Sequence, residues 1–238
     1  PTATPAAQFG FLPLIAGTLW VSLFAILFAL PFGLSVSIYM SEVANPKVRS
    51  WLKPIIELLS GIPSVVYGFF GLIVIVPLIQ KLFDLPVGES GLAGSIVLAI
   101  MALPTIITVT EDAMRNCPRA MREASLALGA SQWQTIYKVV IPYSISGITS
   151  GVVLGIGRAI GETMAVLMVT GNAAVIPTTI LEPLRTIPAT IAAELGEAPA
   201  GGPHYQALFM LGVVLFFITL IINFSVEYIS SKGLKRSK

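Results

Sequence analysis

The sequence predicts an all-α, polytopic bundle of transmembrane helices. Of the 238 residues, 55% are hydrophobic and only 11% are charged, and the mean hydropathy of +0.87 lies outside the range of ordinary soluble domains. Five apolar stretches each supply the roughly 20 residues that a helix needs to cross a bilayer. They cover residues 11–41, 58–80, 91–110, 143–171 and 206–226, and only the fourth contains charges. Helices are expected because they satisfy their own backbone hydrogen bonds in lipid.

The first three stretches each contain residues that interrupt a helix. Pro31 and Gly33 predict a kink or an unwound turn in the first stretch, and Pro104 lies near the end of the third. The second contains a weak segment from Gly61 to Tyr67. Such breaks either bend a helix so that it packs, or place unwound backbone along a pathway, and both interpretations stay open for this segment.

Between the third and fourth stretches, residues 111–142 are polar and predict a compact helical hairpin. Pro118 suits the first turn of a helix, and Gly129 supplies a C-terminal stop for which we expect a positive φ. Ser131, with Gln134 three residues later, has the spacing of a capping box. It predicts a second helix over residues 132–140, which Pro142 interrupts.

Small residues dominate the fourth stretch, and a polar segment follows it. Glycines at four-residue intervals predict close packing against a neighbouring helix, and they are Gly147, Gly151 and Gly155, with Gly157 and Gly161 as a second pair. Residues 172–205 are too polar and too rich in proline to cross the membrane as one helix. Within them, residues 184–197 predict a short amphipathic helix at the outer surface.

The distribution of basic residues predicts the orientation. If the hairpin is cytoplasmic, eleven of the 14 lysines and arginines lie inside, and only Lys81 and Arg185 lie outside. The positive-inside rule favours this topology, with a cytoplasmic C-terminus and Pro1 outside. We therefore expect a further helix to precede residue 1.

Several classes of function find no support in the sequence. The single cysteine, Cys117, cannot form an internal disulfide, and the lone histidine, His204, has no neighbours for a metal site and is expected in an interfacial loop. No phosphate-binding loop for ATP and no zinc-protease motif is present. If the chain moves a solute uphill, the energy comes from another subunit.

Arg158 and Glu162 are the only charges between residues 139 and 181, and their spacing predicts one shared helix face near the middle of the fourth stretch. Each ion costs roughly 2.5 to 3.5 kcal/mol to insert there, so the two are expected to pair or to face a polar cavity. One interpretation is a structural salt bridge. The other is a translocation pathway, in which Arg158 meets an anionic substrate, Glu162 holds the arginine in place and Thr163 adds a hydroxyl.

The hairpin resembles the coupling loop of binding-protein-dependent ABC importer permeases. The family pattern is Glu-Ala-Ala, three residues, Gly, nine residues and Ile-x-Leu-Pro. Here Glu123-Ala124-Ser125 precedes Gly129, and Val139-Val140-Ile141-Pro142 follows at the family spacing. The resemblance implies the type I ABC importer permease fold, and a hairpin that docks on a separate ATPase. The residues it assigns to this coupling are Glu123, Ala124, Ser125, Ala127, Gly129 and Pro142.

A second resemblance narrows the family. The run from Arg158 to Asn172, together with Leu103-Pro104, Glu111-Asp112-Ala113 and the segment from Pro118 to Glu123, is similar to the permeases of phosphate-specific importers. The part after Met164 resembles the C-type subunit of those importers. This implies that the chain is not itself an enzyme and binds no cofactor, since ATP and magnesium belong to the partner ATPase.

The resemblance also implies a set of partners. They are a second permease subunit in a heterodimer, an ATPase dimer, an external phosphate-binding protein, phosphate and the lipid of the inner membrane. The alternatives are a permease for another oxyanion, such as sulfate or molybdate, and a secondary transporter or channel that uses Arg158 and Glu162 as an ion relay. A membrane scaffold or sensor without transport is a further alternative.

These observations divide the chain into three parts. Residues 1–10 are predicted to form an external linker, and residues 233–238 a basic cytoplasmic tail. Residues 11–232 form the permease domain, with the coupling loop at 111–142 and an external loop at 172–205.

Overall fold

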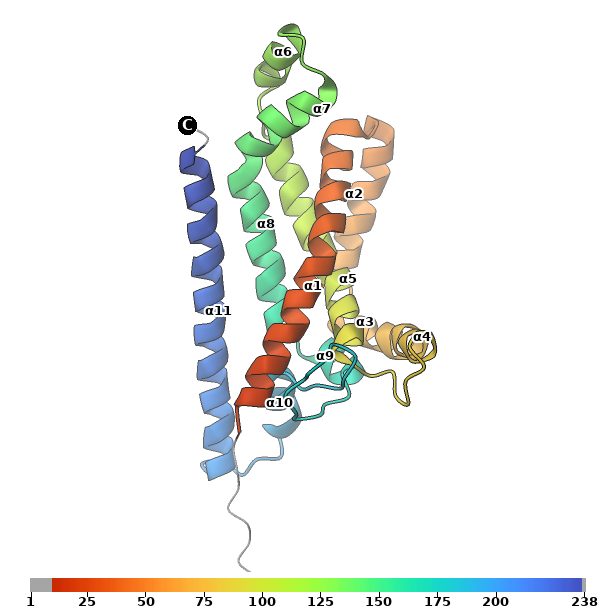
Figure 1. Ribbon diagram of the computed structural model, residues 1–238, viewed down its shortest axis with the longest axis vertical. Coiled ribbons are helices and arrows are strands. Elements are labelled where there is room, and N and C mark those ends of the chain that lie inside the picture. Colours follow the sequence, from red (N-terminus) through yellow and green to blue (C-terminus); the bar gives the residue numbers. More distant parts are fainter. Residues whose placement is uncertain (1–9, 237–238) are drawn as a thin grey trace, which may run out of the picture.

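Long helices run side by side between two ends of the molecule, and a shorter helical segment lies across them (Figure 1). The computed structural model describes residues 10–236, and the side chains of residues 10–228. Within this part the chain is helical, without a strand. Five segments are long and apolar enough to cross a membrane, and they are Leu12–Val43, Ser64–Leu82, Gly91–Arg115, Gln132–Gly161 and Pro203–Tyr228. The all-α prediction and the five predicted crossings are confirmed.

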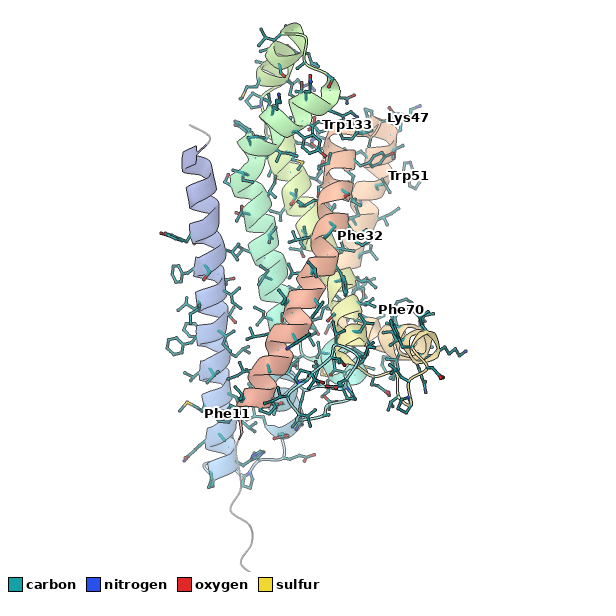
Figure 2. All side chains as sticks on the ribbon, viewed as in Figure 1. Phe11, Phe32, Lys47, Trp51, Phe70 and Trp133 are labelled. Atoms are coloured by element: carbon teal, nitrogen blue, oxygen red, sulfur yellow. The ribbon has the colours of Figure 1, made fainter. Side chains whose placement is uncertain are left out.

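The first crossing is α1 (Leu12–Ile38), which continues through Pro31 as a helix. The Ser35 hydroxyl donates to the carbonyl of Pro31 at 2.6 Å. Of the predicted kink or unwound turn, the unwound turn is absent, because α1 is helical through both Pro31 and Gly33, and the departure from regular α-helix comes later, in the π-helical segment η1 (Tyr39–Val43). Figure 2 shows Phe11 near the start of this crossing and Phe32 along it. Phe32 is 67% exposed, as a lipid-facing residue would be.

The predicted second stretch falls on two separate helical parts. The charged helix α2 (Pro46–Ser60) packs against α5 (Gly91–Arg115). The segments α3 (Ser64–Phe70), η2 (Gly71–Ile75) and α4 (Val76–Leu82) then continue in another direction, with α4 seen close to end-on (Figure 1). Residues 61–63 separate the parts. The predicted second stretch, 58–80, thus begins within α2. The hydropathy pattern did not reveal the boundary between α2 and α3, because the last residues of α2 are apolar although the helix begins with charged ones.

The central element is α5 (Gly91–Arg115), which packs against both α1 and α8 (Ile141–Gly161). A Cβ added at Gly147 would collide with Ala113, and one at Gly155 would lie 2.7 Å from the Ile106 side chain. The close packing predicted from the first glycine series is confirmed. Gly157 and Gly161 face open space within the chain, so the second pair packs against nothing here.

The hairpin comprises α6 (Arg119–Ala127) and α7 (Gln132–Thr135), followed by the π-helical η3 (Ile136–Val140). The prediction that Pro142 interrupts the second helix is wrong, because Gln132–Gly161 is one continuous helical segment. In η3 the amide of Ile141 donates to the carbonyl of Ile136, five residues back. This wider turn places Pro142 in the first turn of α8, where its missing amide hydrogen is not needed.

The predicted fourth stretch is also too long. α8 ends at Gly161, and a short helix, α9 (Met164–Val169), lies in a separate direction at the end opposite the hairpin. The segment that follows contains α10 (Ile187–Glu194), which confirms a helix within 184–197. An isolated bridge between Gly171 and Leu184 closes the intervening loop.

The last crossing is α11 (Pro203–Arg236), which returns to the hairpin end (Figure 1). His204 lies in its first turn, not in a loop as expected, and its Nε2 is 3.2 Å from a Glu194 carboxylate oxygen. Of the predicted terminal parts, residues 1–9 and 237–238 lie outside the described residues, whereas 233–236 continue α11. Its exposed apolar side chains include Phe209, Phe216, Phe217 and Phe224.

Candidate functional site

A tight turn joins the two helices of the hairpin. Gly129 has φ +84°, and its amide donates to the carbonyl of Leu126 at 2.9 Å. Ser131 and Gln134 form the predicted capping box, with the Ser131 amide donating to the Gln134 side chain at 2.8 Å and the Gln134 amide donating to the Ser131 hydroxyl at 3.3 Å. Both predictions are confirmed. The turn geometry needs glycine because a side chain is strained at this φ.

The residues assigned to coupling occupy different positions on the hairpin. Glu123, Ala124 and Ala127 lie on its exposed surface, and Ser125 joins the two helices through a 2.9 Å hydrogen bond between its hydroxyl and that of Thr135. Pro142 lies in α8, away from the exposed turn. The hairpin therefore presents the first three residues, and Ser125 and Gly129 maintain its shape.

Two exposed leucines extend this surface. Leu128 is 90% exposed and Leu126 is 49% exposed, beside the turn at Gly129. Trp133 and Tyr137 are also more than half exposed, with stacked rings 6.4 Å apart. None of these four residues was among the coupling residues predicted from the sequence, although apolar side chains within a polar segment are a signal for a contact surface. An exposed apolar surface on a short rigid hairpin is suited to binding in a groove on another protein.

The hairpin is tied to the end of α1 by an ion pair that sequence analysis missed. The Arg122 guanidinium lies 2.9 Å from a carboxylate oxygen of Glu42, and it also donates to the carbonyl of Met114 at 2.8 Å. The Gln132 side chain donates to the carbonyl of Glu42 at 3.0 Å. Glu42 is the first acidic residue of the chain and follows a long uncharged stretch, which was the available signal.

A second missed cluster surrounds Glu111, which is buried at the end of α5. Its carboxylate lies 2.7 Å from the Arg49 guanidinium and 3.0 Å from the Lys53 ammonium, and Arg115 approaches to 3.9 Å. Lys53 also pairs with Asp112. Partial burial disfavours the charged ammonium, but hydrogen bonds to Asp112 and Glu111 outweigh it and raise the pKa of Lys53 above its ordinary 10.5. This cluster fixes α2 against α5.

The structure does not place Arg158 and Glu162 on one helical face. Arg158 lies in the last turn of α8, whereas Glu162 follows the end of the helix, in an extended conformation with φ −70° and ψ 135°. No ion pair joins the two within the described residues. A Glu162 oxygen instead accepts from the amide of Ala165 at 3.3 Å, and the Thr163 hydroxyl donates to the carbonyl of Gly161 at 3.3 Å. The predicted geometry is wrong because the helix stops at Gly161.

Arg158 is close instead to the second helix break. It lies near enough to Tyr67 of α3 for an electrostatic interaction, and the Tyr67 hydroxyl donates to the carbonyl of Leu59 at 2.7 Å. Gly68, next to Tyr67, contacts α9, where a Cβ would meet Ala165 at 3.1 Å. The breaks at 61–63 and 162–163 thus lie on neighbouring elements beside a half-buried arginine. Discontinuous helices of this kind form substrate sites in other transporters.

Comparison with known proteins identifies the family. The pattern of the family described as "Binding-protein-dependent transport system inner membrane component" matches residues 29–233. The chain belongs to this family. It is 41% identical over 225 residues to the "Probable ABC transporter permease protein YqgH" of Bacillus subtilis, covering 94% of this chain and 73% of that protein. It is 38% identical over 240 residues to the "Phosphate transport system permease protein PstC" of Mesorhizobium japonicum, covering 93% and 73%.

Solved structures of other ABC transporters share the fold. A chain of the MetNI methionine ABC transporter in an inward-facing conformation superposes with a TM-score of 0.71, at 19% identity, over 94% of this chain and 97% of that chain. A bacterial ABC transporter that imports the acidic polysaccharide alginate gives a TM-score of 0.68 at 18% identity, over 95% and 80%. The protein is therefore a multi-pass membrane permease with the type I ABC importer fold.

Proposed function

We propose that this protein is a permease subunit of an ATP-driven importer of inorganic phosphate. Relatives named as phosphate transport permeases are 36–38% identical over at least 90% of the chain, which supports this cargo. The hairpin end is cytoplasmic in this proposal, in accord with the positions of the basic residues. The partners are a second permease, an ATPase dimer that binds ATP and magnesium, and an external phosphate-binding protein.

In the proposed mechanism, the hairpin transmits the motion of the ATPase. Glu123, Ala124, Ala127 and the exposed Leu128 contact the ATPase, and the ion pair between Arg122 and Glu42 carries the displacement to the end of α1. A rigid hairpin is required because a flexible one would absorb the movement. The turn at Gly129, the capping box and the Ser125 to Thr135 hydrogen bond supply that rigidity.

The observation that carries the cargo assignment within this chain is the position of Arg158. It is a half-buried cation beside two helix breaks, without a carboxylate partner among the described residues. An unpaired cation in a membrane interior is costly, and a passing oxyanion offsets that cost. Glu162 and Thr163 shape the adjacent break and complete the proposed pathway.

Reconstitution in liposomes with the three partners tests the proposal. We expect phosphate-loaded binding protein to stimulate ATP hydrolysis and phosphate uptake, and sulfate-loaded protein to have no effect. Stimulation by sulfate or molybdate alone would assign another oxyanion, and uptake without the ATPase would indicate a secondary transporter or channel.

Variants at the helix breaks test the pathway itself. We expect Arg158→Leu, and the double variant Arg158→Leu with Glu162→Leu, to assemble at parental yield and to lose phosphate uptake, because no cation then offsets the desolvated anion. Glu162→Leu alone measures how much phosphate uptake depends on the Glu162 carboxylate at the break after α8. A double variant that transports near the parental rate would contradict a pathway role for Arg158.

A further inference from the structure

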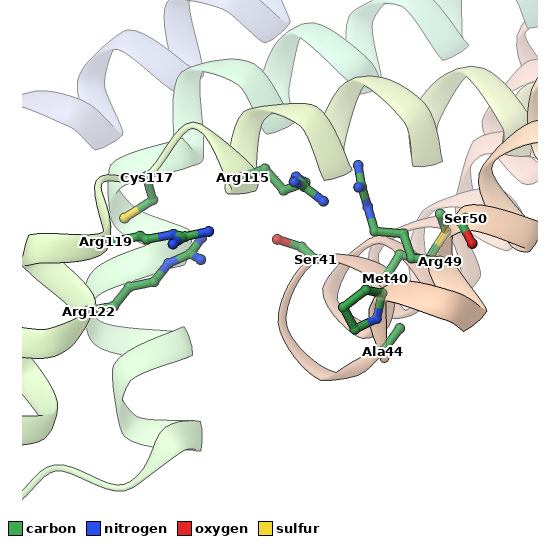
Figure 3. Close-up of a pocket in the computed structure, with 10 residues that line it drawn as sticks. Met40, Ser41, Ala44, Arg49, Ser50, Arg115, Cys117, Arg119 and Arg122 are labelled. Atoms are coloured by element: carbon green, nitrogen blue, oxygen red, sulfur yellow. The ribbon is translucent and has the colours of Figure 1, made fainter.

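A positively charged cavity lies at the hairpin end of the molecule, away from Arg158. It has a volume of about 360 Å³ and opens between the corner of η1 and α2 and the corner of α5 and α6 (Figure 3). Its lining includes four arginines, Arg49, Arg115, Arg119 and Arg122, together with Ser41 and Ser50. This volume is at the small end of the range for ligand sites, roughly 300 to 1,000 Å³.

The carboxylates around the cavity do not balance its arginines. Glu111 lies against Arg49 and Arg115, and Glu42 pairs with Arg122, which leaves four guanidinium groups against two carboxylates. Asp112 is paired with Lys53. Among the described residues, no ion pair includes Arg119. The cavity therefore carries an excess of positive charge.

One guanidinium nitrogen of this cavity has no hydrogen-bond acceptor among the described residues. The Nε of Arg122 is buried without a hydrogen-bond partner, although the rest of the same guanidinium binds Glu42 and Met114. Figure 3 shows the Arg119 and Arg122 side chains directed toward Ser41, with Arg115 at the end of α5 above them and Arg49 on the opposite side of the opening. Guanidinium groups that line one cavity repel each other unless an anion lies between them.

Two helices also begin at this cavity without a negative charge in their first turn. Neither α2 nor α6 has a side-chain cap at its N-terminus or an acidic residue in its first turn. Arg49 and Arg119 instead lie near these N-termini. Because the N-terminus of a helix carries a partial positive charge, the arrangement favours an anion from outside the chain.

We propose that this cavity binds a phosphate-type oxyanion, held by Arg119 and Arg122 of the hairpin and by Arg49 and Arg115 of the bundle. The planar guanidinium group matches the geometry of a phosphoryl group and binds it through paired hydrogen bonds. The bound anion joins the hairpin to the bundle, beside the Glu42 to Arg122 ion pair. The site does not depend on which solute the permease transports. Two sources supply the same group, free inorganic phosphate and the phosphomonoester headgroup of an anionic lipid.

The test measures thermal unfolding of the full chain in nanodiscs as inorganic phosphate is added at constant ionic strength. In phosphatidylcholine nanodiscs, stabilisation by phosphate but not by chloride indicates the free anion. Stabilisation only when phosphatidic acid is included indicates the lipid headgroup. We expect one of these two responses, and the absence of both would overturn the proposal.

Arg119→Gln is the decisive variant, since Arg119 is exposed and its loss breaks no ion pair in the described chain. It should fold normally and bind phosphate or phosphatidic acid about tenfold more weakly or worse, because a charge-assisted hydrogen bond is lost. Lys138→Gln is the matched control, an exposed cation of the same region that does not line the cavity. Equal binding by the two variants would contradict the site.

Arg158→Leu separates this site from the proposed pathway. The anion response should persist in that variant even if its phosphate uptake is lost. A response that disappears in Arg158→Leu and survives in Arg119→Gln would place the bound phosphate on the pathway and would overturn the present assignment.

Discussion

Replacing Glu111 by glutamine removes the negative charge that holds α2 against α5. The side chain of Glu111 is 1% exposed, whereas those of its partners Arg49 and Lys53 are 24% and 25% exposed. Breaking a buried ion pair by removing one partner typically costs about 3 to 5 kcal/mol. Water reaches the two cations in part, so we expect the lower end of that range, about 3 kcal/mol, which lowers the folding equilibrium constant more than a hundredfold.

Reversible unfolding in mixed detergent micelles measures this change, with the adjacent Asp112→Asn as control. Asp112 also pairs with Lys53, but its side chain is 52% exposed, so the control should lose only about 0 to 1 kcal/mol. Equal losses for Glu111→Gln and Asp112→Asn would refute the conclusion that burial of Glu111 makes this cluster important for stability.

Three further predictions concern the turn, the helix packing and the outer loop. Gly129→Val should cost about 1 to 2 kcal/mol because valine is strained at the positive φ, and it should abolish ATP-driven uptake while the amount of protein in the membrane stays normal, whereas Gly129→Asn should be tolerated. Normal uptake by the valine variant would contradict the role of the turn. Gly147→Leu should destabilise the protein by about 1 to 3 kcal/mol because the new side chain would collide with Ala113, and Gly157→Leu should not, because Gly157 faces open space. Equal unfolding midpoints for the two variants would contradict this packing. Hydrogen bonds from the Thr178 hydroxyl and amide lower the pKa of Glu182 below its ordinary 4.5, so the stability that they give the outer loop is present above pH 4.5 and is lost as pH falls through the lowered pKa. Glu182→Gln should remove this acid sensitivity from limited proteolysis of the loop, and an unchanged pH profile would disprove the assignment.

Local patterns in the sequence predicted the features that depend on neighbouring residues. The spans follow from hydropathy, the turn at Gly129 from the need for a positive φ, and the capping box from the spacing of Ser131 and Gln134. The close contact of α8 with α5 follows from the interval between Gly147, Gly151 and Gly155.

The errors arose where hydrogen bonding or distant contacts decide the structure. Pro142 was expected to interrupt the helix, but the π-helical turn before it removes the need for its amide hydrogen. Glu162 was placed on the same helix as Arg158, but α8 ends at Gly161. The Glu162 carboxylate instead accepts a hydrogen bond from the Ala165 amide of α9. The ion-pair partners of Glu42 and Glu111 on other helices, Arg122, Arg49 and Lys53, lie 58 to 80 residues away, so spacing could not reveal them.

Disulfide cross-linking of the hairpin to the ATPase tests the central claim, that this surface is where the motor acts. The native Cys117 is buried and is replaced by alanine, and cysteine is introduced by Ala127→Cys or Leu128→Cys, with Phe216→Cys on α11 as a control distant from the hairpin. With a scan of single cysteines along the ATPase surface, we expect both hairpin positions to cross-link to one groove, and the control to cross-link nowhere. Absence of any cross-link at Ala127 and Leu128 in an assembled complex would contradict the account.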